Sequence, residues 1–202
     1  MFADKKTLKP AIRFKEFTNA WEQHKLQNYL QVSNIKNNIE LDKEDVFSIS
    51  GEFGVVNQIE FLGRSFAGKN LTDYKVVFEG DVVYTKSPLR SNPYGIIKTN
   101  KQKTGIVSTL YAVFKPFDNV DSPFIQTYFE QDYRTNKYLH PMVSKGAKNT
   151  MTISDSNSLS GYVIFPTKYE QQNISRLFSN LDSLITLHQR KLEKLKTSKI
   201  CF

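Results

Sequence analysis

The C-terminal part of the chain carries a heptad repeat of apolar residues, and no other feature of the sequence constrains the fold as much. Alternating steps of four and three residues join its members, which are Ile174, Phe178, Leu181, Ile185, His188, Leu192 and Leu195. On a helix these a and d positions form one stripe, which is typical of a coiled-coil strand that dimerises or pairs with another surface. Leu177 and Leu184 widen the stripe, so packing on the chain's own globular part or on two neighbours also fits.

His188 is the one polar member of this stripe. We interpret it as a tolerated interruption or a register-setting residue. No second His or Cys stands beside it at the spacing that metal ligands need, so the sequence predicts no metal site.

Local signals mark the start of this helix. Pro166 follows a strand-like run, GYVIF, and Thr167 with Glu170 three residues later predicts a capping box. Roughly 30 helical residues reach about 45 Å, well beyond the edge of a small domain. We therefore expect a long helix over residues 166–202 that needs a partner.

The residues before this helix predict strands and at least one further helix. Residues 74–86 contain two β-like runs across a Glu-Gly-Asp turn, and residues 105–115 form a run of β-branched and aromatic residues. Residues 122–139 open with Ser-Pro and carry apolar residues along one face, as far as Tyr133, which predicts a helix. The expected fold class is α+β, a mixed domain followed by a long coiled-coil helix.

Three segments differ in composition along the chain. Residues 1–21 form a polar entry segment, residues 22–165 the mixed domain and residues 166–202 the helix. We expect residues 1–9 to be disordered. The aromatic residues of the entry segment are interpreted as packing that ties it to the domain or to a partner; they are Phe14, Phe17 and Trp21.

Composition excludes several classes of protein. The 202 residues are 39% hydrophobic and 24% charged, which is enough apolar surface to fold. No stretch approaches 18 apolar residues, and the N-terminus lacks the apolar core of a secretory signal, so we expect no membrane association. The single cysteine, Cys201, excludes an intrachain disulfide and a cysteine-based zinc site, and the expected compartment is the reducing cytoplasm.

The charge of the chain points to a polyanionic partner. The formal net charge is +8. Residues 82–117 contain no Asp or Glu but six basic residues, which are Lys86, Arg90, Lys98, Lys101, Lys103 and Lys115. A local excess of this kind can line a phosphate-facing surface, and a solvated loop face is the alternative.

No motif of nucleotide-driven or hydrolytic chemistry is present. The sequence has no GxxxxGK[ST] run and no GxGxxG after a strand, and its three histidines are too dispersed to suggest a catalytic triad. Residues 92–95 (NPYG) are interpreted as a turn. We predict no catalytic residue and no metal ligand in this chain.

Several segments, taken in order, resemble the DNA-specificity subunit of type I restriction-modification systems. These are residues 10–26 (PAIRFKEFTNAWEQHKL), 80–87 (GDVVYTKS), 92–98 (NPYGIIK), 105–114 (GIVSTLYAVF), 146–150 (GAKNT) and the tail 168–196. The resemblance covers residues 10–197, nearly the whole chain.

The resemblance implies that residues 22–165 form a target-recognition domain for double-stranded DNA and that residues 166–202 form the spacer helix. Family members normally carry two such domains and two antiparallel spacer helices, whereas this chain has one of each. A natural half-subunit, a fragment and a product of a rearranged gene remain open. We expect a homodimer that reads a split palindrome.

The resemblance also implies the partners. A non-catalytic specificity component directs a methyltransferase subunit, and with it a translocating restriction subunit, to DNA. The cofactors S-adenosylmethionine, ATP and magnesium would belong to those partner subunits and none to this chain. The alternative is a coiled-coil protein that docks on the methyltransferase subunit and modulates it without reading DNA.

Candidate DNA-binding residues follow from side-chain chemistry. The phosphate candidates are Lys86, Arg90, Lys98, Lys101 and Lys103. Ser87, Asn92 and Tyr94 are candidates for base edges. Lys145, Lys148 and Asn149 lie in or next to the GAKNT segment, whose small residues allow close approach of a sugar-phosphate strand.

Overall fold

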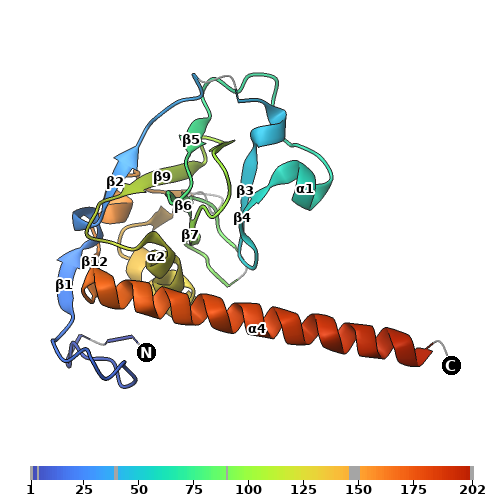
Figure 1. The fold of residues 1–202 in the computed structure, drawn as a ribbon. Coiled ribbons are helices and arrows are strands. Elements are labelled where there is room, and N and C mark those ends of the chain that lie inside the picture. The colour runs from blue at the N-terminus through green and yellow to red at the C-terminus, as the bar shows by residue number, and fades with distance from the viewer. Residues whose placement is uncertain (1, 4, 39–40, 90, 146–150, 201–202) are drawn as a thin grey trace.

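The computed structural model describes residues 2–3, 5–38, 41–89, 91–145 and 151–200. A body of short strands and helices sits on the first part of one long helix, whose C-terminal part projects past the body (Figure 1). No helix in these ranges is both long and apolar enough to cross a membrane.

A four-stranded antiparallel sheet forms the centre of the body. Its strand order is β2, β9, β6, β7. The strands are β2 (Leu30–Ser33), β9 (Tyr111–Pro116), β6 (Val82–Thr85) and β7 (Ile97–Thr99). The register pairs Val83 with Val113 and Leu30 with Pro116.

Both faces of this sheet are buried. Val82 and Tyr84 pack in the main core with α2 (Ser122–Phe129) and α3 (Asp132–Leu139). Val83, on the opposite face, packs in a second core with two antiparallel strand pairs. These pairs are β3 (Phe47–Ser50) with β4 (Gly54–Asn57), and β5 (Lys75–Val77) with β8 (Gly105–Val107). Every residue of β6 is therefore buried, and this continuous apolar run is typical of a strand covered on both sides.

The remaining elements connect or close the body. They are β1 (Glu22–Lys25) paired with β12 (Tyr162–Phe165), β10 (Ser144–Lys145) paired with β11 (Met151–Thr152), α1 (Gln58–Leu62), and the 3₁₀ turns η1 (Leu26–Asn28), η2 (Lys43–Asp45) and η4 (Asn157–Leu159).

The predicted strands exist, but their pairing differs from a local hairpin. Residues 74–86 do form two strands, yet β5 pairs with β8 and β6 pairs with β7 and β9. Gly80 adopts φ +86°, and the Asp81 carboxylate accepts a hydrogen bond from the Phe78 amide, so this turn passes the chain from one sheet to the next. The run 105–115 likewise divides into β8 and β9.

The predicted single helix over residues 122–139 is wrong, because the structure has two helices there. Asp121 caps α2 by accepting from the Phe124 amide, and Gln131 is extended at the start of α3. The Thr135 hydroxyl donates to the Phe129 carbonyl, which satisfies the end of α2 at the break. Tyr133, expected on the buried face, is consequently exposed.

The entry segment packs on the body through its aromatic residues. Trp21 is 1% exposed in the main core, and Phe2 contacts Trp21, Phe124 and Phe178. The expectation of disorder over residues 1–9 is therefore wrong for Phe2 and Ala3, since Ala3 also lies in this core.

Glu170 does not serve as the capping residue that its spacing from Thr167 predicted. Its carboxylate, 1% exposed, accepts two hydrogen bonds from Arg13 at 2.7 Å and one from the Trp21 indole at 3.3 Å. A buried carboxylate gains more from a bidentate guanidinium than from one backbone amide. Glu170 thus ties the entry segment to the long helix.

The long helix α4 (Lys168–Ile200) has two differently placed parts. The proximal part, residues 168–178, packs on α2 and the entry segment, with Ile174 2% exposed and Phe178 against the main core. Every residue of the distal part, residues 181–196, is exposed. The first two stripe positions therefore pack within the chain, which is one of the arrangements that the widened stripe predicted, and the next five are exposed.

Candidate nucleic-acid interface

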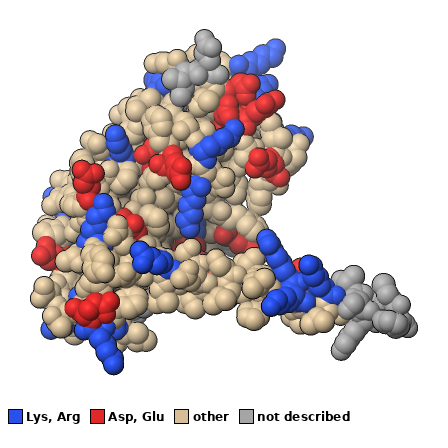
Figure 2. Space-filling model, in the orientation of Figure 1, with Lys and Arg blue, Asp and Glu red and all other residues tan. Residues whose placement is uncertain are grey.

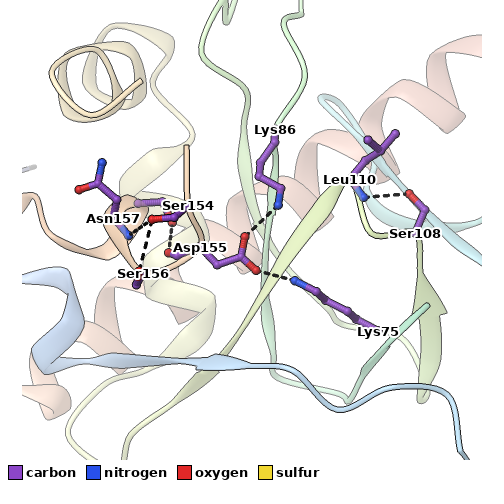
Figure 3. Close-up of polar contacts among 9 residues, drawn as sticks. Lys75, Lys86, Ser108, Leu110, Ser154, Asp155, Ser156 and Asn157 are labelled. Carbon is purple, nitrogen blue, oxygen red and sulfur yellow. Dashed lines mark hydrogen bonds and ion pairs between the residues drawn. The ribbon is translucent and has the colours of Figure 1, made fainter. Parts of the chain in front are cut away.

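Two lysines and one aspartate from three separate elements meet on one side of the body (Figure 3). The Nζ atoms of Lys75 in β5 and Lys86 after β6 lie 2.5 and 2.9 Å from the two carboxylate oxygens of Asp155. We call these three residues the lysine–aspartate triad. With two positive charges and one negative, the triad has a net charge of +1.

Asp155 stays ionised within this triad. Burial by itself would raise the pKa of its carboxyl group, but the hydrogen bonds and the charges of Lys75 and Lys86 outweigh burial and hold that pKa below its usual value. The carboxylate is therefore a permanent partner of both lysines near neutral pH.

A tight turn fixes Asp155. The Ser154 hydroxyl accepts from the Asn157 amide at 3.1 Å, and the Ser158 hydroxyl donates to the Asp155 carbonyl at 2.6 Å. Ser154, Ser156 and Asn157 are exposed around the triad (Figure 3). Their hydroxyl and carboxamide groups can contact a phosphate or a base edge.

The exposed loop after β6 runs beside the turn between β8 and β9. The Lys86 amide donates to the Leu110 carbonyl at 3.3 Å, and the Leu110 amide donates to the Ser108 hydroxyl at 3.4 Å. Ser87 is exposed at the start of this loop. Of the candidates in residues 82–117, Lys86 and Ser87 therefore lie together at the triad.

Asn92 and Tyr94 lie in a turn that packs on α3. The Asn92 side chain, in a residue 6% exposed, donates to the Asp132 carboxylate at 2.6 Å, and the Tyr94 carbonyl accepts from Tyr84 at 2.7 Å. Gly95 has φ +89°, and a Cβ there would lie 1.9 Å from the Thr85 carbonyl oxygen, so only glycine fits. The NPYG segment is thus a turn, as predicted, and Asn92 orients α3 in this conformation.

Two other lysines of the acid-free stretch, Lys98 and Lys103, lie elsewhere and bind carboxylates from distant segments. Lys98 contacts Glu130 at 2.7 Å with its side chain 5% exposed, and Lys103 contacts Asp45 at 3.1 Å. Lys101 is exposed and lines a groove between α2 and α4. The fold therefore divides the stretch among several surfaces and supplies acids that the local sequence lacks.

Four predicted residues cannot be placed by side chain. Arg90, Lys148 and Asn149 lie outside the described residues, and only the backbone of Lys145, in β10, is described. Lys75 and Asp155, by contrast, were not predicted from the sequence. Asp155 is 80 positions from Lys75 and 69 from Lys86, and no local pattern links them.

Basic and acidic side chains alternate over the visible face of the body, whereas basic ones gather toward the C-terminal end of α4 (Figure 2). This end carries Arg190, Lys191, Lys194 and Lys196. Among the residues that the structure describes, no group of three His, Cys, Asp or Glu side chains could hold a metal ion.

Solved structures provide the comparison for this fold. A chain from a study of complex assembly and conformational transition of the type I restriction-modification system matches with a TM-score of 0.51 at 12% identity, over 87% of this chain and 41% of that one. The type I restriction-modification S subunit from M. genitalium matches with a TM-score of 0.51 at 15% identity, over 90% and 46%. No protein-family model matches the sequence, and no curated protein matches it.

These matches confirm the expected fold, an α+β domain followed by a long helix, which this chain shares with the type I S subunit from M. genitalium. At such identities the likeness concerns the fold alone. The chain spans less than half the length of either of these two chains.

Proposed function

We propose that this chain is a specificity component of a type I restriction-modification system, which reads one half of a bipartite site in double-stranded DNA and pairs with a second copy through the distal part of α4. The observation that carries the proposal is the division of α4. Its proximal part packs on a domain with the specificity-subunit fold, while its distal part exposes a row of large apolar side chains. These are Leu181, Leu184, Ile185, Leu192 and Leu195.

The stripe is complementary to itself in the antiparallel direction. In such a pair each a residue faces a d residue of the other helix. With the two-fold axis between Thr186 and Leu187, Phe178 faces Leu195, Leu181 faces Leu192 and Ile185 faces His188, each twice. A two-fold pair of this kind uses the same surface on both copies.

The groove between α2 and α4 supports the same arrangement. It has a volume of about 760 Å³ and is lined by two aromatic residues, Phe2 and Phe178. Three acidic residues and two basic ones also line it, which are Asp121, Glu130, Asp182, Lys101 and Arg176. In the proposed register the partner's Leu195 meets Phe178. The partner's Lys196 comes level with Leu177, two residues from Ser175, whose hydroxyl donates to Asp121 at 2.7 Å.

For the DNA-contacting surface we favour the side of the body that carries the lysine–aspartate triad, Ser87 and the exposed turn at residues 154–157. These groups combine basic and small polar side chains on irregular segments held by strands, which suits contacts to phosphates and base edges. Lys98 and Asn92 are weaker candidates, because both are buried against acidic partners.

Catalysis would reside in the partner subunits. A methyltransferase subunit and a translocating restriction subunit would bring S-adenosylmethionine, ATP and magnesium, and this chain would direct them to the site. A symmetric pair of identical domains predicts a split palindrome as the target.

Light scattering of the purified chain tests the pairing. We expect a mass near twice 23.3 kDa, reduced to a monomer by Leu181→Glu with Ile185→Glu. Ser183→Glu with Leu187→Glu adds the same charge to the opposite side of the helix and should leave the dimer intact. A wild-type monomer at high concentration contradicts the proposal.

Mapping of methylated sites, with this chain and its methyltransferase subunit, tests the reading of DNA. A split palindrome is the expected result, and an asymmetric bipartite site contradicts the homodimer. If the chain binds the methyltransferase subunit but directs no methylation, the alternative of a docking protein that does not read DNA is the better description.

A further inference from the structure

The lysine–aspartate triad has more hydrogen-bonding capacity than its aspartate uses. Each ammonium group has three N–H donors, and one from each lysine contacts Asp155. Within the described ranges, Asp155 is the acceptor of both ammonium groups. The triad therefore retains donors and a positive charge that can bind a further anion.

The geometry of the triad suits a phosphate. Lys75 and Lys86 contact different oxygens of a single carboxylate, so their Nζ atoms lie within reach of one small oxyanion. Two oxygens of a phosphodiester are spaced only slightly more widely than those of a carboxylate. The three side chains are 13, 21 and 15% exposed, so they are held in place but still reachable at the edge of the exposed turn.

We propose that Lys75 and Lys86 form a binding site for one DNA backbone phosphate, and that Asp155 competes with this phosphate for the two lysines. The inference rests on the proposed function. Backbone phosphates are alike in all sequences, so a carboxylate that weakens their binding lowers affinity for non-cognate DNA and increases the share of binding that depends on base contacts. Asp155 is thus a specificity-determining residue.

Asp155→Asn tests this competition. Binding of a 30-base-pair duplex of arbitrary sequence is measured by fluorescence anisotropy over a range of NaCl concentrations. Wild type should bind weakly, and Asp155→Asn should bind about fivefold more tightly at low salt. For this variant the slope of log binding constant against log NaCl concentration should be steeper by up to about one. Lys75→Gln and Lys86→Gln should each bind more weakly, with a slope shallower by about one.

Asp73→Asn is the matched control. Asp73 forms an exposed pair with Lys36, with side chains 67 and 60% exposed, so its substitution makes the same change in net charge without altering the triad. We expect Asp73→Asn to change affinity less than twofold. Equal gains for Asp155→Asn and Asp73→Asn would show an effect of net charge alone and overturn the inference.

Weaker duplex binding by Asp155→Asn would also overturn it, because Asp155 would then only position the lysines. Should this variant melt at a lower temperature than wild type, the two glutamine variants decide the question, and unchanged slopes in both reject the phosphate site.

Two further experiments are needed. One distinguishes a DNA phosphate from free inorganic phosphate, and the other distinguishes failure of the phosphate site from failure of DNA reading. Inorganic phosphate is titrated against wild type and Asp155→Asn, and phosphate binding that duplex DNA does not displace would assign the site to a free anion and contradict the inference. If folded wild type and all variants fail to bind any duplex, DNA reading itself fails. If wild type binds DNA and the triad variants match it, only the phosphate site fails.

Discussion

The proximal and distal parts of α4 belong to one heptad repeat, yet their surroundings are opposite. In the proximal part Ile174 is 2% exposed, and the buried Glu170 carboxylate accepts a hydrogen bond from Arg13 of the entry segment. In the distal part Leu192 and Leu195 are 53 and 62% exposed. The comparison shows that apolar periodicity predicts which face of a helix is buried. Whether the chain's own body or another surface buries that face depends on the rest of the fold.

The difference also separates two kinds of stability. Substitutions in the proximal part should change the free energy of unfolding of the body, whereas substitutions in the distal part should change association between copies. Experiments on matched residues in the two parts can therefore break or sharpen the comparison.

The largest effect is expected for Glu170→Gln in the proximal part. This change leaves the Arg13 guanidinium, 14% exposed, without its carboxylate, and removal of one partner of a buried ion pair costs about 3 kcal/mol. Urea unfolding followed by circular dichroism at fixed protein concentration measures the loss. Asp182→Asn in the distal part makes the same charge change and should cost less than about 0.5 kcal/mol. Similar losses for both would mean that the two parts of α4 do not differ in this way.

The next effect is expected for Leu192→Ala in the distal part. Two copies of Leu192 would face Leu181 in an antiparallel pair, so the dissociation constant should rise on the order of a hundredfold, about 3 kcal/mol per dimer. Sedimentation over a concentration series measures this constant. The melting temperature of the monomer, measured at low protein concentration, should be unchanged. Ile174→Ala should do the reverse, lowering the melting temperature by removing a buried side chain. A dimer insensitive to Leu192→Ala would point to pairing through another surface.

The division of α4 also shows what the sequence could predict. Pro166 and Thr167 placed the start of the helix correctly, because a proline stop and a polar cap act through neighbouring residues. The partners of Glu170 lie 149 and 157 positions away, and a local capping box was the wrong prediction for it. Signals that act within a turn are legible in the sequence, whereas contacts that depend on the folded body are not.

The candidate site repeats this lesson. Lys86 and Ser87 were predicted from local composition and lie at the triad, but Lys75 stands outside the acid-free stretch and Asp155 in a polar turn. Lys98 belonged to the same stretch and is buried against Glu130. An excess of basic residues along the chain therefore did not become an excess on one surface, because the fold brings carboxylates to three of the lysines.

The smallest effect is expected from a change of pH, which should act on the body through Asp81. Burial raises the pKa of this carboxyl group to about 6, although the Phe78 amide and the charge of Lys115 partly oppose the shift. The folded protein thus binds this proton more tightly than the unfolded chain, so stability from Asp81 is present at acidic pH and is lost as the pH rises through about 6.

The pH effect can be measured against a variant that lacks it. Wild type should gain about 1 kcal/mol of unfolding free energy between pH 7 and pH 5 relative to Asp81→Asn, which keeps an acceptor for the Phe78 amide but has no proton to bind. Asp155 does not interfere in this window, because its depressed pKa places its own loss of stability at more acidic pH. Urea unfolding at both pH values gives the comparison. Equal pH dependence in the two proteins would mean that folded Asp81 is ionised at pH 5 and that the buried sheet tolerates its charge.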